Sequence, residues 1–202
     1  MVLPTLSFES QLWAKGYQAI VGIDEVGRGS WAGPLVAAGV IFSSDFKIPT
    51  GLADSKMLKS RQRENLAQII EKEAVRLTIQ QISADMINSL GIGRATHFLF
   101  RKIVRILNPD FCLIDAFHIK YFSRKKQMAV KNGDQICASI AAASVIAKVH
   151  RDAQMRKLHF IYPNYGFGKH KGYGTKLHQQ AIKTFGFCEI HRTSYNLAYL
   201  VR

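Results

Sequence analysis

Two apolar segments near the N-terminus constrain the fold most, because both are rich in β-forming residues and the first also carries two acidic ones. They are AIVGIDEVGR (19–28) and LVAAGVIF (35–42), joined by the Gly- and Pro-containing stretch 29–34. Apolar runs on either side of a short turn-forming stretch predict a β-hairpin. Asp24 and Glu25 are therefore expected on or beside a strand of the core.

Beyond the hairpin, helical and strand-like patterns alternate. We predict helices over 60–74, 84–90, 96–107, 136–158 and 176–185, and strands over 75–82 and 111–117. Gly93 is expected to separate the second helix from the third, and Pro109 to terminate the third. Asp134 lies just before the longest helix, at a natural N-cap position. This order predicts an α/β fold, and a length of 202 residues suits a single domain spanning 1–202.

The chain is strongly basic. Its 28 Lys and Arg residues against 14 Asp and Glu give a formal net charge of +14 and a pI near 9.9. Such an excess favours a polyanionic partner such as nucleic acid, because each neutralised phosphate releases counterions. By itself, however, the charge fits a basic enzyme without such a partner equally well.

The sequence carries no sign of export or membrane insertion. Cys112, Cys137 and Cys188 show no C-x-x-C spacing, which argues against a structural zinc site and a disulfide framework. The longest run of small or apolar residues, 136–147, is shorter than the ~20 residues that span a bilayer. The N-terminus has no basic region before an apolar stretch, so it does not resemble a signal peptide. We expect a cytoplasmic protein without a membrane partner, with a monomer as the default.

Four acidic residues stand in unusual settings for a charge. Asp24 and Glu25 interrupt an apolar strand, Asp115 lies within FCLIDAF (111–117), and Asp134 lies at a helix start. Buried carboxylates are costly unless they are paired or bind metal, and converging ones repel each other until a divalent cation neutralises them. Mg²⁺ and Mn²⁺ prefer such oxygen ligands. Two ions ~4 Å apart would activate water for in-line attack on a phosphodiester.

Structural explanations compete with this hypothesis. Asp134 alone is more commonly a helix cap than a ligand, and Asp115 alone fits an exposed strand end. Successive strand side chains point to opposite faces, so Asp24 and Glu25 cannot both reach one metal from a regular strand. We therefore expect Asp24 to ligate through its side chain, and Glu25 to serve a second ion or to offer its backbone carbonyl.

The acidic residues lie in segments that resemble ribonuclease HII in the same order. These segments are GIDEVGRGSWAGPLVAAGVIF (22–42), ADSK (53–56), LIDAF (113–117), NGDQICASIAAASVIAKVHRD (132–152), HKGYGTKLH (170–178) and HRTSY (191–195). The resemblance extends from about residue 19 to 195. It implies an α/β, ribonuclease H-like mixed β-sheet flanked by helices, with a C-terminal helical, substrate-binding part at about 160–202. It also implies a catalytic metal site made by Asp24, Glu25, Asp115 and Asp134, with Mn²⁺ or Mg²⁺ as cofactor and two ions during catalysis.

The resemblance further implies an endoribonuclease for RNA–DNA hybrids. It would also cut on the 5′ side of ribonucleotides embedded in duplex DNA, leaving 3′-hydroxyl and 5′-phosphate ends. In that family the tripeptide matched by Gly27, Arg28 and Gly29 reads the 2′-hydroxyl, and the tyrosine matched by Tyr173 stacks on the next sugar. Taken alone, G-R-G is more commonly a tight turn with a surface arginine, and Tyr173 a core or surface tyrosine. Candidate phosphate contacts are Lys56, Ser139, Ser144, Lys148, His170 and Lys171.

Departures from the family pattern leave the carboxylates intact. Ser30, Trp31, Met57 and Ala116 differ from the residues expected there, and a weaker grip on substrate is expected near Met57. Ribonuclease HIII, which shares the four-acid core, is disfavoured because G-R-G is present and the acidic pair lies near the N-terminus. A noncatalytic nucleic-acid-binding module is a second alternative. The short tail after HRTSY leaves little room for a peptide that binds a sliding clamp, so no clamp partner is expected.

Overall fold

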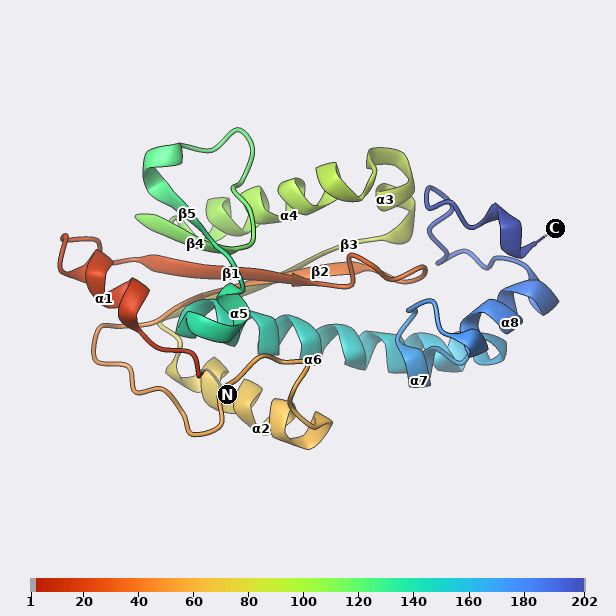
Figure 1. Cartoon of the computed structure of the whole chain (residues 1–202), viewed down its shortest axis with the longest axis horizontal. Coiled ribbons are helices and arrows are strands. Elements are labelled where there is room, and N and C mark those ends of the chain that lie inside the picture. Colours follow the sequence, from red (N-terminus) through yellow and green to blue (C-terminus); the bar gives the residue numbers. More distant parts are fainter. Residues whose placement is uncertain (1–2, 202) are drawn as a thin grey trace.

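The computed structural model describes residues 3–201, and its centre is a mixed five-stranded sheet with helices on both faces (Figure 1). The strand order is β3-β2-β1-β4-β5. These strands are β1 (Ile20–Val26), β2 (Leu35–Ile41), β3 (Arg76–Ile82), β4 (Phe111–Asp115) and β5 (Gln127–Val130). β2 pairs antiparallel with β1 and β3, whereas β4 runs parallel to both β1 and β5. The predicted α/β class and the hairpin of β1 and β2 are confirmed.

Helices α6 (Ala138–Ile161) and α4 (Ile92–Leu107) cover opposite faces of the sheet (Figure 1). α6 packs close to β1, because a Cβ atom on Gly22 would lie 2.2 Å from the backbone carbon of Ser139. α2 (Ser60–Glu73) packs on α6, and α3 (Ala84–Leu90) packs beside α4. Within residues 3–201, no helix combines the length and apolarity needed to cross a bilayer.

Some predicted boundaries were wrong. α4 begins at Ile92 rather than 96, because Gly91, with φ of 74°, makes the break and Gly93 lies inside the first turn. The strand predicted over 111–117 ends at Asp115, since Ala116 has φ of 63° and leaves the extended conformation. β5 was not predicted, because four residues carry too little periodicity to indicate a strand.

Asp134 does not cap the longest helix. It lies in a separate short helix, α5 (Gly133–Ile136), which follows Asn132 in the left-handed region. The N-terminus of α6 is instead capped from α1 (Ser7–Trp13), where Glu9 is 1% exposed. One carboxylate oxygen of Glu9 accepts from the Ser139 N–H at 2.8 Å. A buried acid at the N-terminus of a long helix is favourable because the helix dipole is positive there.

The chain after α6 forms a small C-terminal part beyond the end of the sheet (Figure 1). It contains η2 (Pro163–Tyr165), α7 (Phe167–His170), α8 (Lys176–Phe185) and η3 (Ala198–Leu200). Two buried histidines hold it together, with 3.1 Å between Nε2 of His178 and Nε2 of His191. Nδ1 of His178 donates to the Tyr173 carbonyl, and Nδ1 of His191 accepts from the Cys188 N–H. This arrangement requires both rings to be neutral, with His191 Nε2–H as the donor between them.

The histidine pair should make the protein sensitive to acid. Burial lowers the pKa of His178 and of His191 to about 4, below the usual value of about 6.5. Their contribution to stability is therefore complete above pH about 6.5 and is lost as the pH falls towards about 4. We expect the melting temperature of the wild type to fall more steeply through this range than that of His178→Gln. Parallel melting curves for the two proteins would contradict the assignment.

Candidate active site

Asp24 and Asp115 are neighbours at the carboxyl ends of two parallel strands. Ile23 pairs with Ile114, so the next residue of β1 and of β4 is an aspartate. The carboxyl ends of parallel strands are the usual place for binding sites in α/β folds. Asp24 is 6% exposed, its Oδ1 accepts from the Glu25 N–H at 2.7 Å, and it lines the same cavity as Ser144 of α6. The topology thus brings together two acids that are 91 positions apart in the sequence.

Glu25 extends from the other face of β1. Its neighbours Ile23 and Ala37 pack into the apolar cluster under α4, and alternation along the strand places Glu25 on that side. Its Oε1 atom lies 3.8 Å from NH1 of Arg28. Because β1 ends here, Glu25 still lines the same cavity as Asp24. This geometry agrees with the expected divergence of the two side chains, and the atom that Glu25 would offer to a metal stays a prediction.

Asp134 reaches this group through α5. The Gly133 N–H donates to Oδ1 of Asp115 at 2.7 Å, which fixes the start of α5 beside β4. Asp134 is 4% exposed, and its Oδ2 accepts from Nζ of Lys56 at 3.0 Å. All four predicted carboxylates therefore lie in one region at the end of the sheet.

The acids of this region disfavour one another's charge. Burial raises the pKa of Asp24 well above its usual value, and the charges of Glu25 and Asp115 raise it further. Burial also raises the pKa of Glu25 to about 7, although Arg28 opposes the rise. The pKa of Asp115 is raised by burial against the hydrogen bond from Gly133, with an added contribution from the charge of Asp134. Groups held in this way are typical of functional sites.

The donor set fits a hard divalent cation. Asp24, Glu25, Asp115 and Asp134 offer carboxylate oxygens, and a cation would relieve the repulsion that raises their pKa values. Within residues 3–201, however, no three His, Cys, Asp or Glu side chains converge closely enough to hold a metal ion as they stand. Part of the compensating charge comes from Lys56, which is paired with Asp134. A bound cation would have to draw the carboxylates together.

A cavity of about 460 Å³ opens in front of Asp24 and Glu25. Of the predicted substrate contacts, it is lined by Lys56, Ser144, Lys148 and Tyr173. Ser144 is buried and hydrogen-bonds the hydroxyl of Ser55 at 2.9 Å. Nζ of Lys148 pairs with Asp152 at 2.8 Å. Lys56 is paired with Asp134 but its side chain is 74% exposed, and Tyr173 makes no side-chain hydrogen bond or ion pair among residues 3–201.

Three other predicted phosphate contacts point elsewhere. Ser139 is 1% exposed beneath β1, so its side chain cannot reach a phosphate. His170 uses both ring nitrogens on the backbone, one with the Tyr165 carbonyl and one with the Gly172 N–H. The amino group of Lys171 donates to the Gly168 carbonyl at the end of α7. The structure therefore gives Ser139 and His170 no support as phosphate contacts, and Lys171 would have to leave its partner first.

The turn after β1 contains Gly27, Arg28 and Gly29. Gly27 has φ of 93°, and a Cβ there would lie 2.2 Å from Nε of Arg151, so only glycine fits. A Cβ on Gly29 would meet no atom of residues 3–201 within 4 Å. The side chain of Arg28 is 44% exposed, and its guanidinium lies 5.1 Å from the centre of the Phe117 ring. The turn is therefore packed against Arg151 at Gly27 and is open at Gly29.

Sequence reasoning missed the residues that support this turn. Arg192 is completely buried and donates to the carbonyls of Gly27 at 2.6 Å, Arg28 at 3.1 Å and Gly33 at 2.9 Å. The hydroxyl of Tyr195 also donates to the Arg28 carbonyl. Arg151 binds the carbonyls of 32, 34 and 171, and its guanidinium lies 5.6 Å from the centre of the Tyr173 ring. Arg192 lies in HRTSY (191–195) and Arg151 in VHRD (149–152), and both segments resemble the family. The sequence nevertheless did not indicate what either arginine does.

The departures from the family pattern have distinct surroundings. The Ser30 hydroxyl is buried and has no hydrogen-bond partner within the described part of the chain. Trp31 packs so closely on Gly174 that a Cβ on Gly174 would lie 2.3 Å from the Trp31 ring. Ala116 adopts φ of 63°, which explains why glycine suits this position. Met57 is 56% exposed next to Lys56, so a lysine in its place would face solvent.

Comparison with known proteins assigns these features to one family. The family model described as Ribonuclease HII matches residues 21–198. A Ribonuclease HII from Listeria innocua serovar 6a is 44% identical over 191 residues, which cover 94% of this chain and 72% of that protein. A Ribonuclease HII from Alkaliphilus oremlandii is 39% identical over 201 residues, or 96% and 98% of the two chains.

Solved structures agree with the family and with the fold. The RNase HII of Archaeoglobus fulgidus, determined in complex with PCNA, aligns with a TM-score of 0.77 and 26% identity over 91% of this chain and 97% of that one. Bst-RNase HIII in complex with Mn²⁺ aligns with a TM-score of 0.68 over 91% and 69% of the chains, and at 18% identity it shows the fold alone. On the strength of the family match and of these relatives, the chain belongs to the ribonuclease HII family of endonucleases, which act on RNA–DNA hybrids.

Proposed function

We propose that the protein hydrolyses the RNA strand of hybrids and also incises on the 5′ side of single ribonucleotides within duplex DNA, leaving 3′-hydroxyl and 5′-phosphate ends. Catalysis would depend on two Mg²⁺ or Mn²⁺ ions. The observation that carries this proposal is the gathering of Asp24, Glu25 and Asp115, all with raised pKa values, beside Asp134. Bst-RNase HIII, which was solved with Mn²⁺, has the same fold and supports divalent-metal use.

The four carboxylates would hold the ions, and the bound ions would supply charge stabilisation to the phosphodiester and its leaving oxygen. The protein's own contribution is position and charge. The Glu25 N–H orients Asp24, and the Gly133 N–H orients Asp115. Lys56, with a side chain 74% exposed, is placed to move from Asp134 to a substrate phosphate when a cation takes over its role.

Recognition of the ribonucleotide is assigned to the turn and to the C-terminal part. Gly27, Arg28 and Gly29 follow the acidic pair after Val26, where backbone groups can approach a sugar closely. Tyr173 lines the same cavity from the C-terminal part, which we place at about 160–202. We propose that the turn reads the 2′-hydroxyl while Tyr173 stacks on the next sugar.

The direct test is an incision assay on duplex DNA with one embedded ribonucleotide, beside an all-DNA duplex and an RNA–DNA hybrid. We expect cutting with Mg²⁺ or Mn²⁺ of the hybrid and of the embedded ribonucleotide, and no cutting with EDTA. End analysis should find 3′-hydroxyl and 5′-phosphate termini. Binding of these duplexes without metal-dependent cutting would instead support a noncatalytic binding module.

Gly29→Ala separates recognition from folding at the turn. Because the new Cβ meets open space, the melting temperature should stay within about 1 °C of the wild type, as for ordinary surface changes. A methyl group at the point of closest approach should lower cutting at a ribonucleotide roughly tenfold or more, on the scale of a misplaced reactant. Gly27→Ala is the contrasting variant, since its Cβ would collide with Arg151 and reduce stability as well. Unchanged cutting by Gly29→Ala would remove this residue from the recognition surface.

A further inference from the structure

Two more cavities lie on the α4 side of the sheet. Their volumes are about 550 and 520 Å³, and Gly93, His97 and Lys120 line both of them. One wall is the N-terminal half of α4, and the other is the segment 116–126 between β4 and β5. We call the two cavities together the α4 groove.

The α4 groove begins at the acidic site. Arg28 lines its first cavity and lies 3.8 Å from Glu25, which lines the cavity of the carboxylates. Ala116 and Phe117, directly after Asp115, also line the first cavity. A strand that leaves the carboxylates on this side therefore meets the groove without crossing another element.

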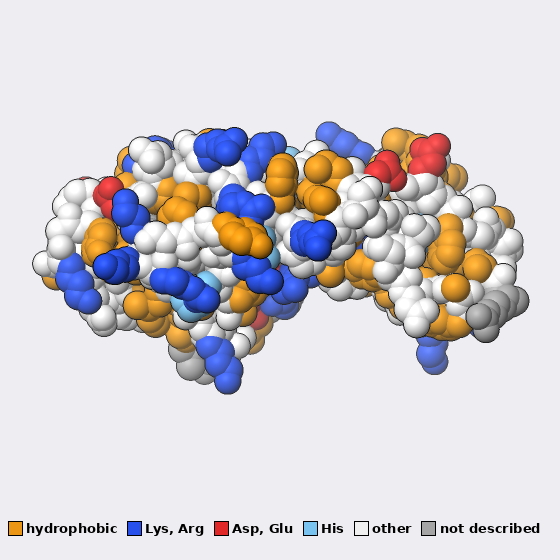
Figure 2. All heavy atoms as spheres, turned by 90° about the horizontal axis from the view of Figure 1, so that it is seen from above, with side chains coloured by type: hydrophobic (Ala, Val, Ile, Leu, Met, Phe, Trp, Pro, Cys, Tyr) orange, Lys and Arg blue, Asp and Glu red, His pale blue; other side chains and the backbone are white. Residues whose placement is uncertain are grey.

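Positive charge follows the whole groove. Its cations are Arg28, Arg94, Arg101, Lys120 and Arg124, and among residues 3–201 no carboxylate lines either cavity. Figure 2 shows Lys and Arg side chains spread over this side of the molecule, where little acidic surface is visible. Burial lowers the pKa of His97 in the floor of the groove, and the charges of Lys120, Arg101 and Arg28 lower it further. The cations thus act on one shared space.

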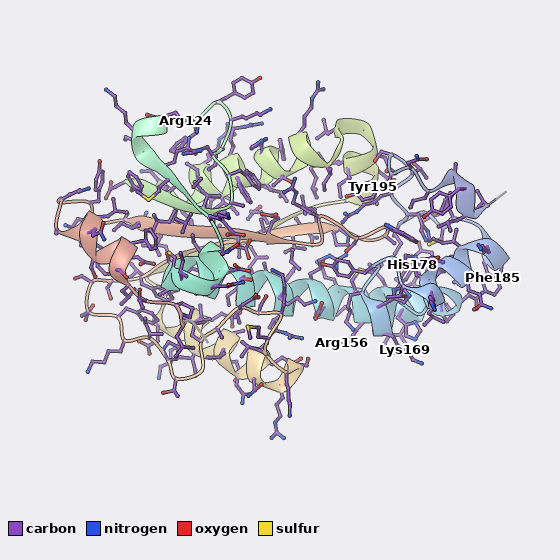
Figure 3. The ribbon with its side chains drawn as sticks, in the orientation of Figure 1. Arg124, Arg156, Lys169, His178, Phe185 and Tyr195 are labelled. Carbon is purple, nitrogen blue, oxygen red and sulfur yellow. The ribbon has the colours of Figure 1, made fainter. Side chains whose placement is uncertain are left out.

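The segment 116–126 is held against α4. NH1 of Arg101 donates to the Lys120 carbonyl at 3.4 Å, and the Lys120 N–H is 3.5 Å from Nδ1 of His97. Tyr121 is 94% exposed with φ of 59°, and its ring centre lies 5.9 Å from the Arg101 guanidinium. Arg124 lies at the opposite end of the molecule from the C-terminal part (Figure 3). A fixed basic groove with an exposed aromatic at its end matches what nucleic-acid backbones bind.

We propose that the α4 groove binds the sugar-phosphate backbone of the substrate duplex outside the carboxylate site. The proposal rests on the proposed function, since the duplex is the same one that would be cut. The groove adds affinity and leaves the chemical step unchanged, because Arg94, Arg101, Lys120 and Arg124 do not line the cavity of the carboxylates. Its contribution grows with the length of duplex beyond the ribonucleotide.

The test replaces Arg94, Arg101, Lys120 and Arg124 together with glutamine. In a matched control, four exposed lysines elsewhere are replaced with glutamine, so that the same number of charges is removed: Lys15, Lys47, Lys72 and Lys183. Binding is measured in EDTA by fluorescence anisotropy over a range of salt, on a long duplex with one ribonucleotide and on one trimmed to the bases around it. Cutting is measured on the same duplexes with Mg²⁺.

We expect the groove variant to bind the long duplex roughly tenfold or more weakly, with the salt slope reduced by about 0.9 for each phosphate that the protein no longer neutralises. Its binding of the trimmed duplex and its kcat should match those of the control. If the quadruple variant melts early, Lys120→Gln with Arg124→Gln repeats the test, because neither side chain makes a hydrogen bond or ion pair among the described residues.

If the groove variant and the control lose equal affinity for the long duplex, the proposal is overturned, since the change in net charge would then explain the loss. Wild-type affinity of the groove variant for the long duplex would also overturn it, and cutting by the wild type would leave the proposed function standing. Conversely, a wild type that binds through the groove but never cuts would contradict only the proposed function.

Discussion

Asp24→Asn should abolish metal-dependent cutting while making the metal-free protein more stable at neutral pH. The side chain of Asp24 is buried beside two other acids, and its pKa is raised well above the usual value. Because the pKa of Asp24 is raised in the folded protein, the contribution of its protonated form to stability is complete below the ordinary aspartate pKa. That contribution is lost as the pH rises through the pKa of Asp24 in the folded protein. Asparagine cannot ionise, so this loss disappears. Losing a residue that only supports a metal ligand costs up to about 100-fold in activity, so losing a ligand should reduce cutting by at least about that factor.

The melting temperature with and without Mn²⁺ tests both halves of this prediction. An ion at 100 times its dissociation constant stabilises the folded state by about 2.7 kcal/mol, so the wild type should gain stability with metal and Asp24→Asn should gain little. Asp110→Asn is the matched control. Hydrogen bonds from the Ala19 and Gln18 amides lower the pKa of Asp110, so this variant should lose stability and keep the wild-type response to metal.

An Asp24→Asn protein with the wild-type metal response would show that Asp24 is not a ligand. A variant less stable than the wild type without metal would show that repulsion does not dominate at this position. The difference between the two proteins should shrink as the pH falls towards the usual aspartate value, because the wild-type carboxylate is then protonated.

The sequence predicted those parts of the fold that depend on local pattern. The hairpin and the helices α2, α3 and α8 follow from the spacing of apolar residues within each segment. Asp24 and Asp115 were found because a charge inside an apolar run conflicts with its surroundings. Their closeness could not be predicted from either run, since it comes from the parallel pairing of β1 with β4.

The failures involve contacts between distant segments. Ser139 and His170 lie in segments that match the family, yet a matching segment does not reveal that Ser139 is buried or that the His170 ring binds the Tyr165 carbonyl. Asp134 looked like a helix cap because α5 and α6 cannot be separated by periodicity alone. The α4 groove is divided between residue 28, α4 and the segment after β4, so no single stretch of sequence displays it.

Arg192 is the clearest case of a role hidden from the sequence, because it acts on a carbonyl 165 residues away. Its buried guanidinium faces tyrosines and backbone carbonyls, and burial lowers its pKa. Figure 3 shows Tyr195 between the end of the sheet and the C-terminal part, where its hydroxyl also receives a hydrogen bond from Arg192 at 3.0 Å. The C-terminal part therefore holds the turn of Gly27 and Arg28 from behind.

Arg192→Met should loosen this turn and weaken cutting at a ribonucleotide. Met fills much of the same space, but the Gly33 carbonyl loses both of its hydrogen bonds from Arg192, and the carbonyls of Gly27 and Arg28 keep only the Ser30 N–H and the Tyr195 hydroxyl. An unsatisfied buried acceptor costs about 1–3 kcal/mol, so the free energy of unfolding should fall by roughly 3 kcal/mol. Cutting is then measured at a temperature where circular dichroism shows the variant folded. There kcat/KM for an embedded ribonucleotide should still be up to about 100-fold lower, as expected when a contacting group is displaced.

Two further variants distinguish positioning from general loss of stability. Arg192→Lys keeps a charge with a single donor group and should recover part of the activity. Tyr195→Phe removes only the hydroxyl that donates to the Arg28 carbonyl, so its effect on cutting should be smaller than that of Arg192→Met. If folded Arg192→Met cuts as the wild type does, the carbonyl contacts serve stability alone. If its activity falls while Asp24 still confers the metal-dependent gain in melting temperature, the turn and the metal site are separable parts of one active site.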